Sequence, residues 1–129
     1  MNILIADDET AIARRLEKLL RQLPEVEIVN SRTRITDAVL ALIELQPDLL
    51  ILDHQFPNGT GLEIARKLQH YSPGTHVVVY SAFLLDIDKQ RYQEAGIQAF
   101  IDKTHEVEEL LECIQRYHTR MTRETIDSN

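Results

Sequence analysis

Short apolar runs and longer amphipathic stretches alternate along the chain five times, and this alternation limits the folds that the chain can adopt. The apolar runs, rich in Val, Ile and Leu, lie at residues 3–6, 26–29, 49–52, 77–80 and 99–101. After the first run, Ile12, Leu16 and Leu20 recur at the spacing of one helix face. Strands that alternate with helices indicate a parallel sheet covered by helices on both faces. The sequence therefore predicts an α/β, doubly wound fold with a five-stranded parallel sheet.

Helix-ending residues separate the amphipathic stretches from the runs that follow them. Pro24 and Pro47 stop the first two stretches, and the turn sequence SPG at 72–74 follows the third. Gly96 suits the left-handed position that closes a helix near residues 85–95. The chain thus divides into five strand–helix units without a break.

The composition of the five runs indicates which strands are central. The runs at 3–6, 49–52 and 77–80 are apolar throughout, as strands covered on both faces usually are. The run at 26–29 contains a glutamate, and the run at 99–101 is short, so these two are expected at the edges. The flavodoxin-like strand order 2-1-3-4-5 meets this expectation and is the order that we predict. The patterning alone also allows the order 2-3-1-4-5.

Charge and cysteine content exclude several classes of function. The chain has 14 basic and 21 acidic residues, and the net charge of −7 argues against binding to nucleic acid or to anionic lipid. Cys113 is the only cysteine, which rules out an intrachain disulfide and fits a reducing cytoplasm. No apolar run approaches the roughly 18 residues that a membrane span needs. We therefore expect a cytoplasmic domain that does not contact membranes.

Polar side chains follow four of the five predicted strands. Asp7 and Asp8 follow the first strand, Asp53 the third, Ser81 the fourth and Lys103 the fifth. Because the carboxyl ends of parallel strands meet at one edge of a sheet, we expect these side chains to converge there. A buried carboxylate is costly unless something pairs with it, so Asp53 is expected to find its partners among the other four.

A cluster of this kind favours phosphoryl chemistry. Carboxylates that lie close together repel one another unless a cation lies among them. Ligands that are all oxygen suit a hard ion, most plausibly Mg²⁺. A metal ion, a lysine and a hydroxyl together can hold a phosphoryl group, and Asp53 could receive that group as an acyl phosphate.

Four motifs give the chain a resemblance to a known family. They are ADDE at 6–9, LDHQFPNGTG at 52–61, YSA at 80–82 and EAGIQAFIDK at 94–103. Over residues 2–118 the chain resembles the receiver domain of two-component response regulators. The spacing D-x-x-x-P-x-x-x-G within the second motif is fairly specific, and each of the other motifs comes in order at its own strand end.

The resemblance implies a role for each residue of the cluster. Asp53 would accept a phosphoryl group from the phosphohistidine of a sensor histidine kinase or a histidine phosphotransfer protein. Asp8, Asp53 and the backbone carbonyl of Gln55 would coordinate Mg²⁺, with Asp7 acting through water. Lys103 would bridge first to the acceptor carboxylate and then to the phosphoryl group.

The resemblance also implies a switch. Ser81 would hydrogen-bond a phosphoryl oxygen, and Phe100 occupies the position of the family's aromatic switch residue. Phosphorylation would then bias the face built from the fourth helix, the fifth strand and the fifth helix, which a downstream protein target recognises. The domain would catalyse its own phosphorylation and autodephosphorylation, so it is not expected to be a classified enzyme.

Three details of the sequence qualify the resemblance. Thr104 follows Lys103 where many receivers have proline after a cis bond, so a cis and a trans bond both remain open here. Phe83, two residues beyond Ser81, is hypothesised to shield the phosphoryl group from water. His54 should point away from the acceptor, because neighbouring side chains in a strand alternate.

Other functions and boundaries remain open at this level. A receiver-like docking module without phosphotransfer is one alternative. A small Mg²⁺-dependent aspartyl-phosphate phosphatase is another, although such enzymes usually read D-x-D after the first strand and this chain reads D-D-E. The expected receiver domain spans residues 1–118, and residues 119–129 are expected to be a polar tail or the start of a linker. We expect a stand-alone receiver, with one excised from a larger regulator as the alternative, and homodimerisation through the fourth and fifth helices stays open.

Overall fold

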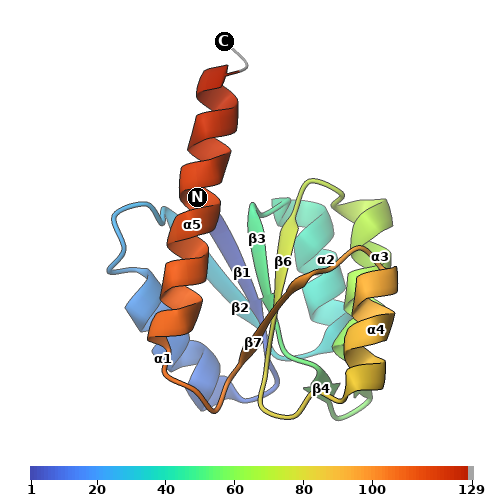
Figure 1. Cartoon of the computed structure of the whole chain (residues 1–129). Helices are drawn as coiled ribbons and strands as arrows, with labels where there is room; N and C mark the ends of the chain where they lie inside the picture. The colour runs from blue at the N-terminus through green and yellow to red at the C-terminus, as the bar shows by residue number, and fades with distance from the viewer. Residues whose placement is uncertain (128–129) are drawn as a thin grey trace.

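Five parallel strands form one sheet at the centre of the protein, as a computed structural model that describes residues 1–127 shows (Figure 1). The strands are β1 (Asn2–Ala6), β2 (Ile28–Arg32), β3 (Leu49–Leu52), β6 (His76–Ser81) and β7 (Ala99–Asp102). Their order is β2-β1-β3-β6-β7, which is 2-1-3-4-5 when only these strands are numbered. The predicted order is confirmed, and the alternative is excluded because β1 pairs with both β2 and β3.

Helices cover both faces of this sheet. They are α1 (Thr10–Leu20), α2 (Ile35–Leu45), α3 (Gly61–Tyr71), α4 (Asp86–Glu94) and α5 (Glu108–Asp127). Helices α1 and α5 lie on one face, and α2, α3 and α4 lie on the other (Figure 1). The predicted doubly wound α/β fold is therefore confirmed.

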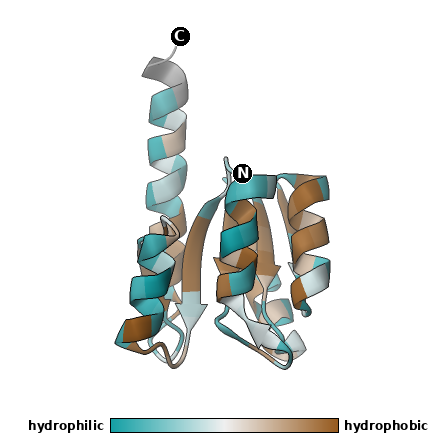
Figure 2. Ribbon diagram, turned by 90° about the vertical axis from the view of Figure 1, so that its right-hand side faces the viewer, coloured by the Kyte–Doolittle hydropathy of each residue, from teal (hydrophilic) through white to brown (hydrophobic). Residues whose placement is uncertain are grey.

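The strands are apolar throughout because successive side chains enter two different cores. In β1, Leu4 packs with α2 and α3, whereas Ile3 and Ile5 pack with α1 and α5. In β3, Leu50 and Ile51 divide in the same way. Figure 2 shows the hydrophobic strands between helices that carry both hydrophilic and hydrophobic residues. Burial on both faces holds the strand ends, and hence the residues that follow them, in fixed positions.

The second strand differs from its prediction. The apolar run suggested residues 26–29, but β2 runs from Ile28 to Arg32 and includes polar residues. Its bounds follow from its partner, since Asn2 pairs with Ile28 and Ala6 pairs with Arg32. An edge strand that is paired on one side only tolerates polar residues along its length.

The last helix is longer than expected. Helix α5 continues through Asp127 and extends beyond the end of the sheet that lies away from β4 (Gln55–Phe56) (Figure 1). The sequence had suggested a polar tail or the start of a linker from residue 119. The helix continues because Tyr117 and Met121 extend its apolar stripe against the core on that face. The boundary at residue 118 stays a prediction, and residues 128–129 of the expected tail lie outside the described residues. None of the helices in the described part combines the length and apolarity that crossing a membrane requires.

A short hairpin joins β3 to α3 and was not predicted. Its strands are β4 and β5 (Gly59–Thr60), which pair antiparallel. The hairpin returns the chain closely past the end of β3, where the backbone N–H of Gly61 donates to the carbonyl of His54 at 2.7 Å. A side chain at Gly61 has no room, because its Cβ would lie 2.3 Å from the Asp53 carbonyl oxygen.

We expect the substitution Gly61→Ala to lower the free energy of unfolding by about 1–3 kcal/mol, the usual cost of overpacking. The added methyl group would also meet the Tyr92 hydroxyl at 2.8 Å. Gly74→Ala is the matched control, because nothing lies within 4 Å of the Cβ that it adds. Urea denaturation of both variants measures the difference, and equal stabilities would contradict the packing argument.

Candidate functional site

The register of the sheet brings the two acidic strand ends together. Ala6 of β1 pairs directly with Leu52 of β3, so Asp7 and Asp53 leave the sheet side by side. The backbone N–H of Asp53 donates to the Ala6 carbonyl at 2.9 Å, which fixes the start of this segment. Both carboxylates are buried, with 3% of Asp7 and 6% of Asp53 exposed.

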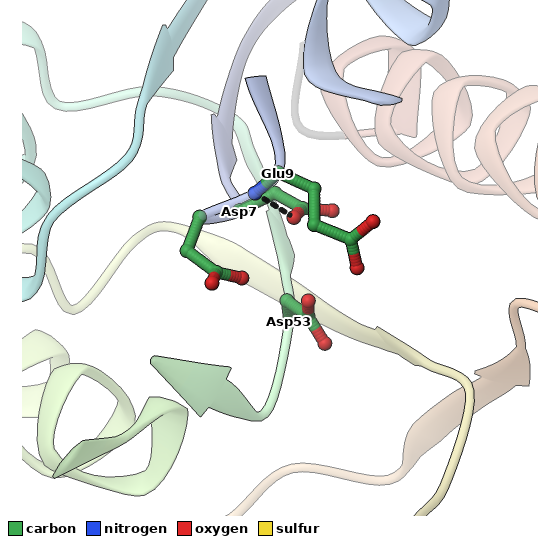
Figure 3. Close-up of side chains that lie close together, drawn as sticks. Asp7, Glu9 and Asp53 are labelled. Carbon is green, nitrogen blue, oxygen red and sulfur yellow. Dashed lines mark hydrogen bonds between the residues drawn. The ribbon is translucent and has the colours of Figure 1, made fainter. Parts of the chain in front are cut away.

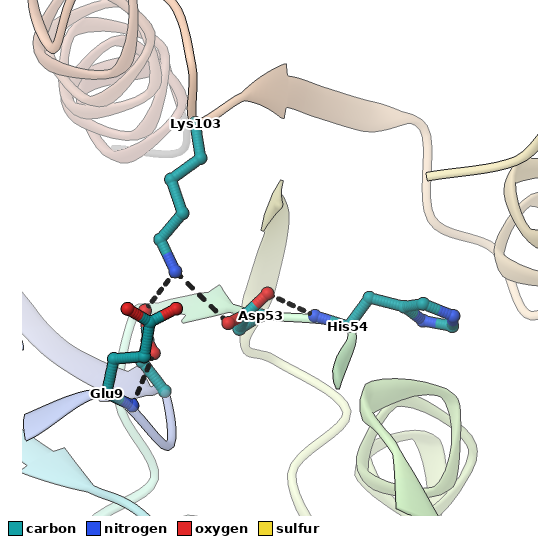
Figure 4. Close-up of polar contacts among 5 residues, drawn as sticks. Glu9, Asp53, His54 and Lys103 are labelled. Carbon is teal, nitrogen blue, oxygen red and sulfur yellow. Dashed lines mark hydrogen bonds and ion pairs between the residues drawn. The ribbon is translucent and has the colours of Figure 1, made fainter. Parts of the chain in front are cut away.

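Lys103 joins the two carboxylates from the far edge of the sheet. Its Nζ donates to Asp7 Oδ2 at 2.6 Å and to Asp53 Oδ2 at 3.1 Å (Figure 4). Only 9% of its side chain is exposed, so these ion pairs are largely removed from water. The expected convergence of Asp53 and Lys103 is what the structure shows.

The buried charges alter one another's protonation. Burial raises the pKa of the Asp7 carboxyl, although the Lys103 ammonium and the backbone N–H of Glu9 oppose that rise. Burial alone would lower the pKa of Lys103, but Asp7 and Asp53 outweigh it and the pKa is raised overall. Lys103 therefore stays cationic beside the two carboxylates.

Four carboxylates lie close together at the carboxyl ends of the strands. One oxygen from each of Asp7, Asp8, Glu9 and Asp53 lies within 4.8 Å of the others (Figure 3). The expected approach of Asp8 to Asp53 is therefore present, and Glu9 is an addition that the sequence reasoning missed. Glu9 is part of the acidic motif at 6–9, which was the available signal, and its backbone N–H donates to Asp7 Oδ1 at 2.9 Å.

A small pocket of about 120 Å³ opens over Asp53. Five of the residues singled out from the sequence line it, namely Asp8, Asp53, Gln55, Ser81 and Lys103. Phe83 forms part of its wall while remaining 76% exposed. Asp7 does not line the pocket, and its two carboxylate oxygens accept hydrogen bonds from Lys103 and from the backbone N–H of Glu9. Two carboxylates, a hydroxyl and an ammonium thus lie around one space that can hold a small ligand.

Phe100 lies beside this pocket rather than in it. Its half-buried ring lines a neighbouring cavity of about 440 Å³, and Ser81 and Phe83 line both spaces. The ring also meets Tyr92 edge-on, with 6.2 Å between the ring centroids. Ser81 and Phe100 therefore share one cavity wall, next to the pocket that holds Asp53.

The turn after Lys103 resolves a point that the sequence left open. No peptide bond within the described residues is cis, so Lys103 and Thr104 are joined by a trans bond. Asp102 Oδ1 accepts hydrogen bonds from both the backbone N–H and the hydroxyl of Thr104, at 2.8 and 2.6 Å. These bonds hold the turn that directs Lys103 towards the carboxylates.

His54 points away from the acceptor carboxylate, as predicted (Figure 4). Its Nδ1 lies 2.7 Å from the hydroxyl of Tyr92, and its Nε2 lies 3.6 Å from Asp88 Oδ2. Both partners belong to α4. The sequence offered no signal for this contact, because a tyrosine in a largely polar helix is interpreted as an ordinary core residue.

Comparisons with known proteins identify the family. A family model described as the response regulator receiver domain matches residues 3–115. The protein-glutamate methylesterase/protein-glutamine glutaminase 3 of Geobacter sulfurreducens is 32% identical over 103 residues, which are 80% of this chain and 28% of that protein. The transcriptional regulatory protein DesR of Bacillus subtilis is 31% identical over 115 residues, which are 89% of this chain and 57% of that protein. The chain spans less than two thirds of either relative.

Solved structures agree with the family model. A CheY-like response regulator receiver domain protein from Methanospirillum hungatei JF-1 matches with a TM-score of 0.83 and 25% identity, over 95% of this chain and 97% of that chain. The response regulator domain of Thermotoga maritima CheB matches with a TM-score of 0.82 and 25% identity, over 92% and 96% of the two chains. Sequence and fold lead to the same conclusion: this chain belongs to the family of receiver domains of two-component response regulators.

Proposed function

We propose that Asp53 accepts a phosphoryl group from the phosphohistidine of a sensor histidine kinase or a histidine phosphotransfer protein. Receiver domains are phosphorylated by histidine kinases and act on downstream targets. The observation that carries the proposal for this residue is its position, since Asp53 lies at the pocket with Oδ2 3.1 Å from Lys103 Nζ. A carboxylate oxygen of Asp53 forms the new O–P bond, the P–N bond of the donor breaks, and the donor imidazole takes up a proton.

Two neighbouring side chains support this transfer. The ammonium of Lys103 is already paired with the acceptor and can follow the negative charge onto the phosphoryl group. Ser81 lines the same pocket, where its hydroxyl can donate to a phosphoryl oxygen. Both groups gain charge-assisted hydrogen bonds once the phosphoryl group has arrived.

The acidic cluster fits Mg²⁺. Its ligands are all oxygen, which suits a hard divalent ion, and the fit rests on that donor set. Asp8, Asp53 and the backbone carbonyl of Gln55 would hold the ion. Asp7 would act through water, because Lys103 and the backbone N–H of Glu9 already engage its two oxygens. When bound, Mg²⁺ would offset the negative charge of the carboxylates and of the incoming phosphoryl group.

Phosphorylation of Asp53 would act as a molecular switch rather than as a metabolic reaction. A phosphoryl group adds negative charge and three acceptor oxygens at Asp53, which draws Ser81 and Lys103 towards it. Ser81 shares a cavity wall with Phe100, so a shift of Ser81 changes the space beside that ring. The face built from α4, β7 and α5 would then favour the arrangement that a downstream protein target binds.

The cellular setting follows the family. We place the domain in the cytoplasm, and we assign residues 1–118 to the receiver. The receiver would act alone or as part of a longer regulator, and either form could dimerise through α4 and α5. Self-catalysed phosphorylation and autodephosphorylation would set how long the signal lasts.

Incubation with a small-molecule phosphodonor and Mg²⁺ should add one phosphoryl group to the protein, measured by intact mass. Asp53→Asn should abolish the gain, because it removes the attacking carboxylate. Asp86→Asn, an exposed position in α4, is the matched control and should be phosphorylated normally. Rapid multiple turnover would instead indicate a phosphatase, and no modification of the wild-type protein would indicate a docking module.

Neutralising Asp8 should raise the free energy of unfolding in the absence of divalent ions by about 1 kcal/mol, because Asp8→Asn relieves repulsion in the acidic cluster. Mg²⁺ should stabilise the wild-type protein but have little effect on this variant. Thermal unfolding with EDTA and with MgCl₂ measures both effects. Glu94→Gln, at the exposed end of α4, should keep the full response to Mg²⁺. An unchanged Mg²⁺ response in Asp8→Asn would remove Asp8 from the metal site.

Phe83→Glu should shorten the lifetime of the acyl phosphate severalfold, because a charged side chain on the pocket wall admits water that the phenyl ring excludes. The rate of loss of the phosphorylated mass after removal of the donor measures this lifetime. Leu85→Glu is the control, since Leu85 is 67% exposed in the same loop but does not line the pocket of Asp53. The shielding hypothesis fails if both variants decay at the wild-type rate.

A further inference from the structure

Helix α4 is held to the rest of the domain by one buried side chain. Tyr92 is fully buried, whereas each of the other residues of α4 is half-buried or exposed. The neighbouring helix α3, on the same face of the sheet, buries five residues. The position of α4 therefore depends largely on what Tyr92 contacts.

The tyrosine hydroxyl contacts the residue next to the acceptor. Its oxygen lies 2.7 Å from His54 Nδ1, and the two rings meet edge-on at 5.5 Å between centroids. Burial, reinforced by Asp88 and Asp53, raises the pKa of the Tyr92 hydroxyl, so it stays protonated and can donate. With Nδ1 as the acceptor, the His54 Nε2–H faces Asp88 Oδ2 at 3.6 Å. The hydroxyl of Tyr92 thus holds the ring of His54, which is 7% exposed, and Asp88 lies near its other nitrogen.

The backbone of His54 in turn orients the acceptor carboxylate. Its N–H donates to Asp53 Oδ1 at 2.7 Å, while Lys103 holds Asp53 Oδ2 (Figure 4). Its carbonyl accepts from the N–H of Gly61 at 2.7 Å, so the residue is fixed on three sides. The Tyr92 hydroxyl and the Asp53 carbonyl oxygen crowd the same side of Gly61, which leaves this junction little freedom.

We propose that His54 is a positioning residue for the phosphoacceptor and that Tyr92 anchors it, so that α4 helps to set the orientation of the Asp53 carboxylate. This inference rests on the proposed role of Asp53. It adds a buried link between α4 and the acceptor carboxylate that does not pass through Ser81. The contacts run from α4 through Tyr92 and His54 to Asp53 Oδ1.

The link acts in both directions. If the position of α4 affects the orientation of Asp53, then a phosphoryl group on Asp53 affects α4 by the same free energy. Tyr92 also packs edge-on against Phe100, so a change at His54 reaches the ring beside the neighbouring cavity. Loss of the hydroxyl of Tyr92 would break the chain of contacts while leaving the ring in place.

The test compares variants that remove or retain the contact. Tyr92→Phe removes only the hydroxyl, and His54→Leu removes the ring nitrogen that accepts its hydrogen bond. His54→Asn is the conservative replacement, because one polar atom of its amide takes the position of Nδ1. Tyr117→Phe is the matched control, since the hydroxyl of Tyr117 lies 3.4 Å from the carbonyl of Asp48. Asp48 comes just before β3, at the end of that strand away from Asp53. All variants are measured well below their unfolding temperatures.

Two readouts separate positioning from stability. The first is the initial rate of phosphorylation by a small-molecule phosphodonor with Mg²⁺, per folded molecule. We expect Tyr92→Phe and His54→Leu each to lower it about fivefold, and His54→Asn to remain within about twofold of wild type. The second is the backbone amide resonance of His54 in ¹H–¹⁵N spectra, which should move upfield in Tyr92→Phe, where residue 54 is unchanged, as its bond to Asp53 weakens. When each is combined with Tyr92→Phe, His54→Leu and His54→Asn should give equal initial rates of phosphorylation.

The inference is overturned if Tyr92→Phe and His54→Leu lower the unfolding temperature but match Tyr117→Phe in rate, and if Tyr92→Phe also matches it in the His54 resonance. A purely structural role predicts that result. If the wild-type protein is not phosphorylated at Asp53, the proposed function fails, and the amide resonance still tests the link to α4. If His54→Leu fails to fold, Tyr92→Phe decides the question through both readouts. If Tyr92→Phe fails to fold, His54→Leu and His54→Asn decide it through the initial rate.

Discussion

The ion pairs of Lys103 with Asp7 and Asp53 join segments that are far apart in the chain. The three residues leave the sheet from β1, β3 and β7, and the lysine lies 96 and 50 positions from its two partners. Such pairs form only when the strand order and register are correct, because a shift of one residue would turn each side chain to the opposite face. The charged groups at this edge therefore depend on the apolar sheet beneath them, and removal of the lysine would leave two buried carboxylates without a cation.

The sheet supplies the buried apolar contacts of the fold, and the residues at the carboxyl ends of its strands supply the chemical groups of the site. Strand residues such as Leu4, Leu50 and Leu52 are fully buried and fix the backbone up to the last residue of each strand. The polar residues beyond them are held by a few hydrogen bonds in a cluster whose charges repel one another. This division explains how one edge can hold carboxylates, a hydroxyl and an ammonium together without loss of the fold.

Sequence patterning predicted the features that depend on periodicity. The fold class, the bounds of β3, and the convergence of Asp8, Asp53 and Lys103 all follow from apolar runs and from what comes after them. Patterning could not choose between the two strand orders, since either places apolar strands in the centre. It placed β2 too early, because pairing with β1 rather than local hydrophobicity sets the ends of an edge strand. It missed the contact between His54 and Tyr92, which depends on tertiary packing alone.

Helix α4 combines weak attachment with a direct contact to the residue next to Asp53. Of its nine residues, only Tyr92 is buried, and the remainder make little contribution to either core. Substitutions at the other positions should therefore cost little folding free energy. The outer surface of this helix can therefore vary in sequence without loss of the fold, as long as Tyr92 and the sheet beneath it are kept.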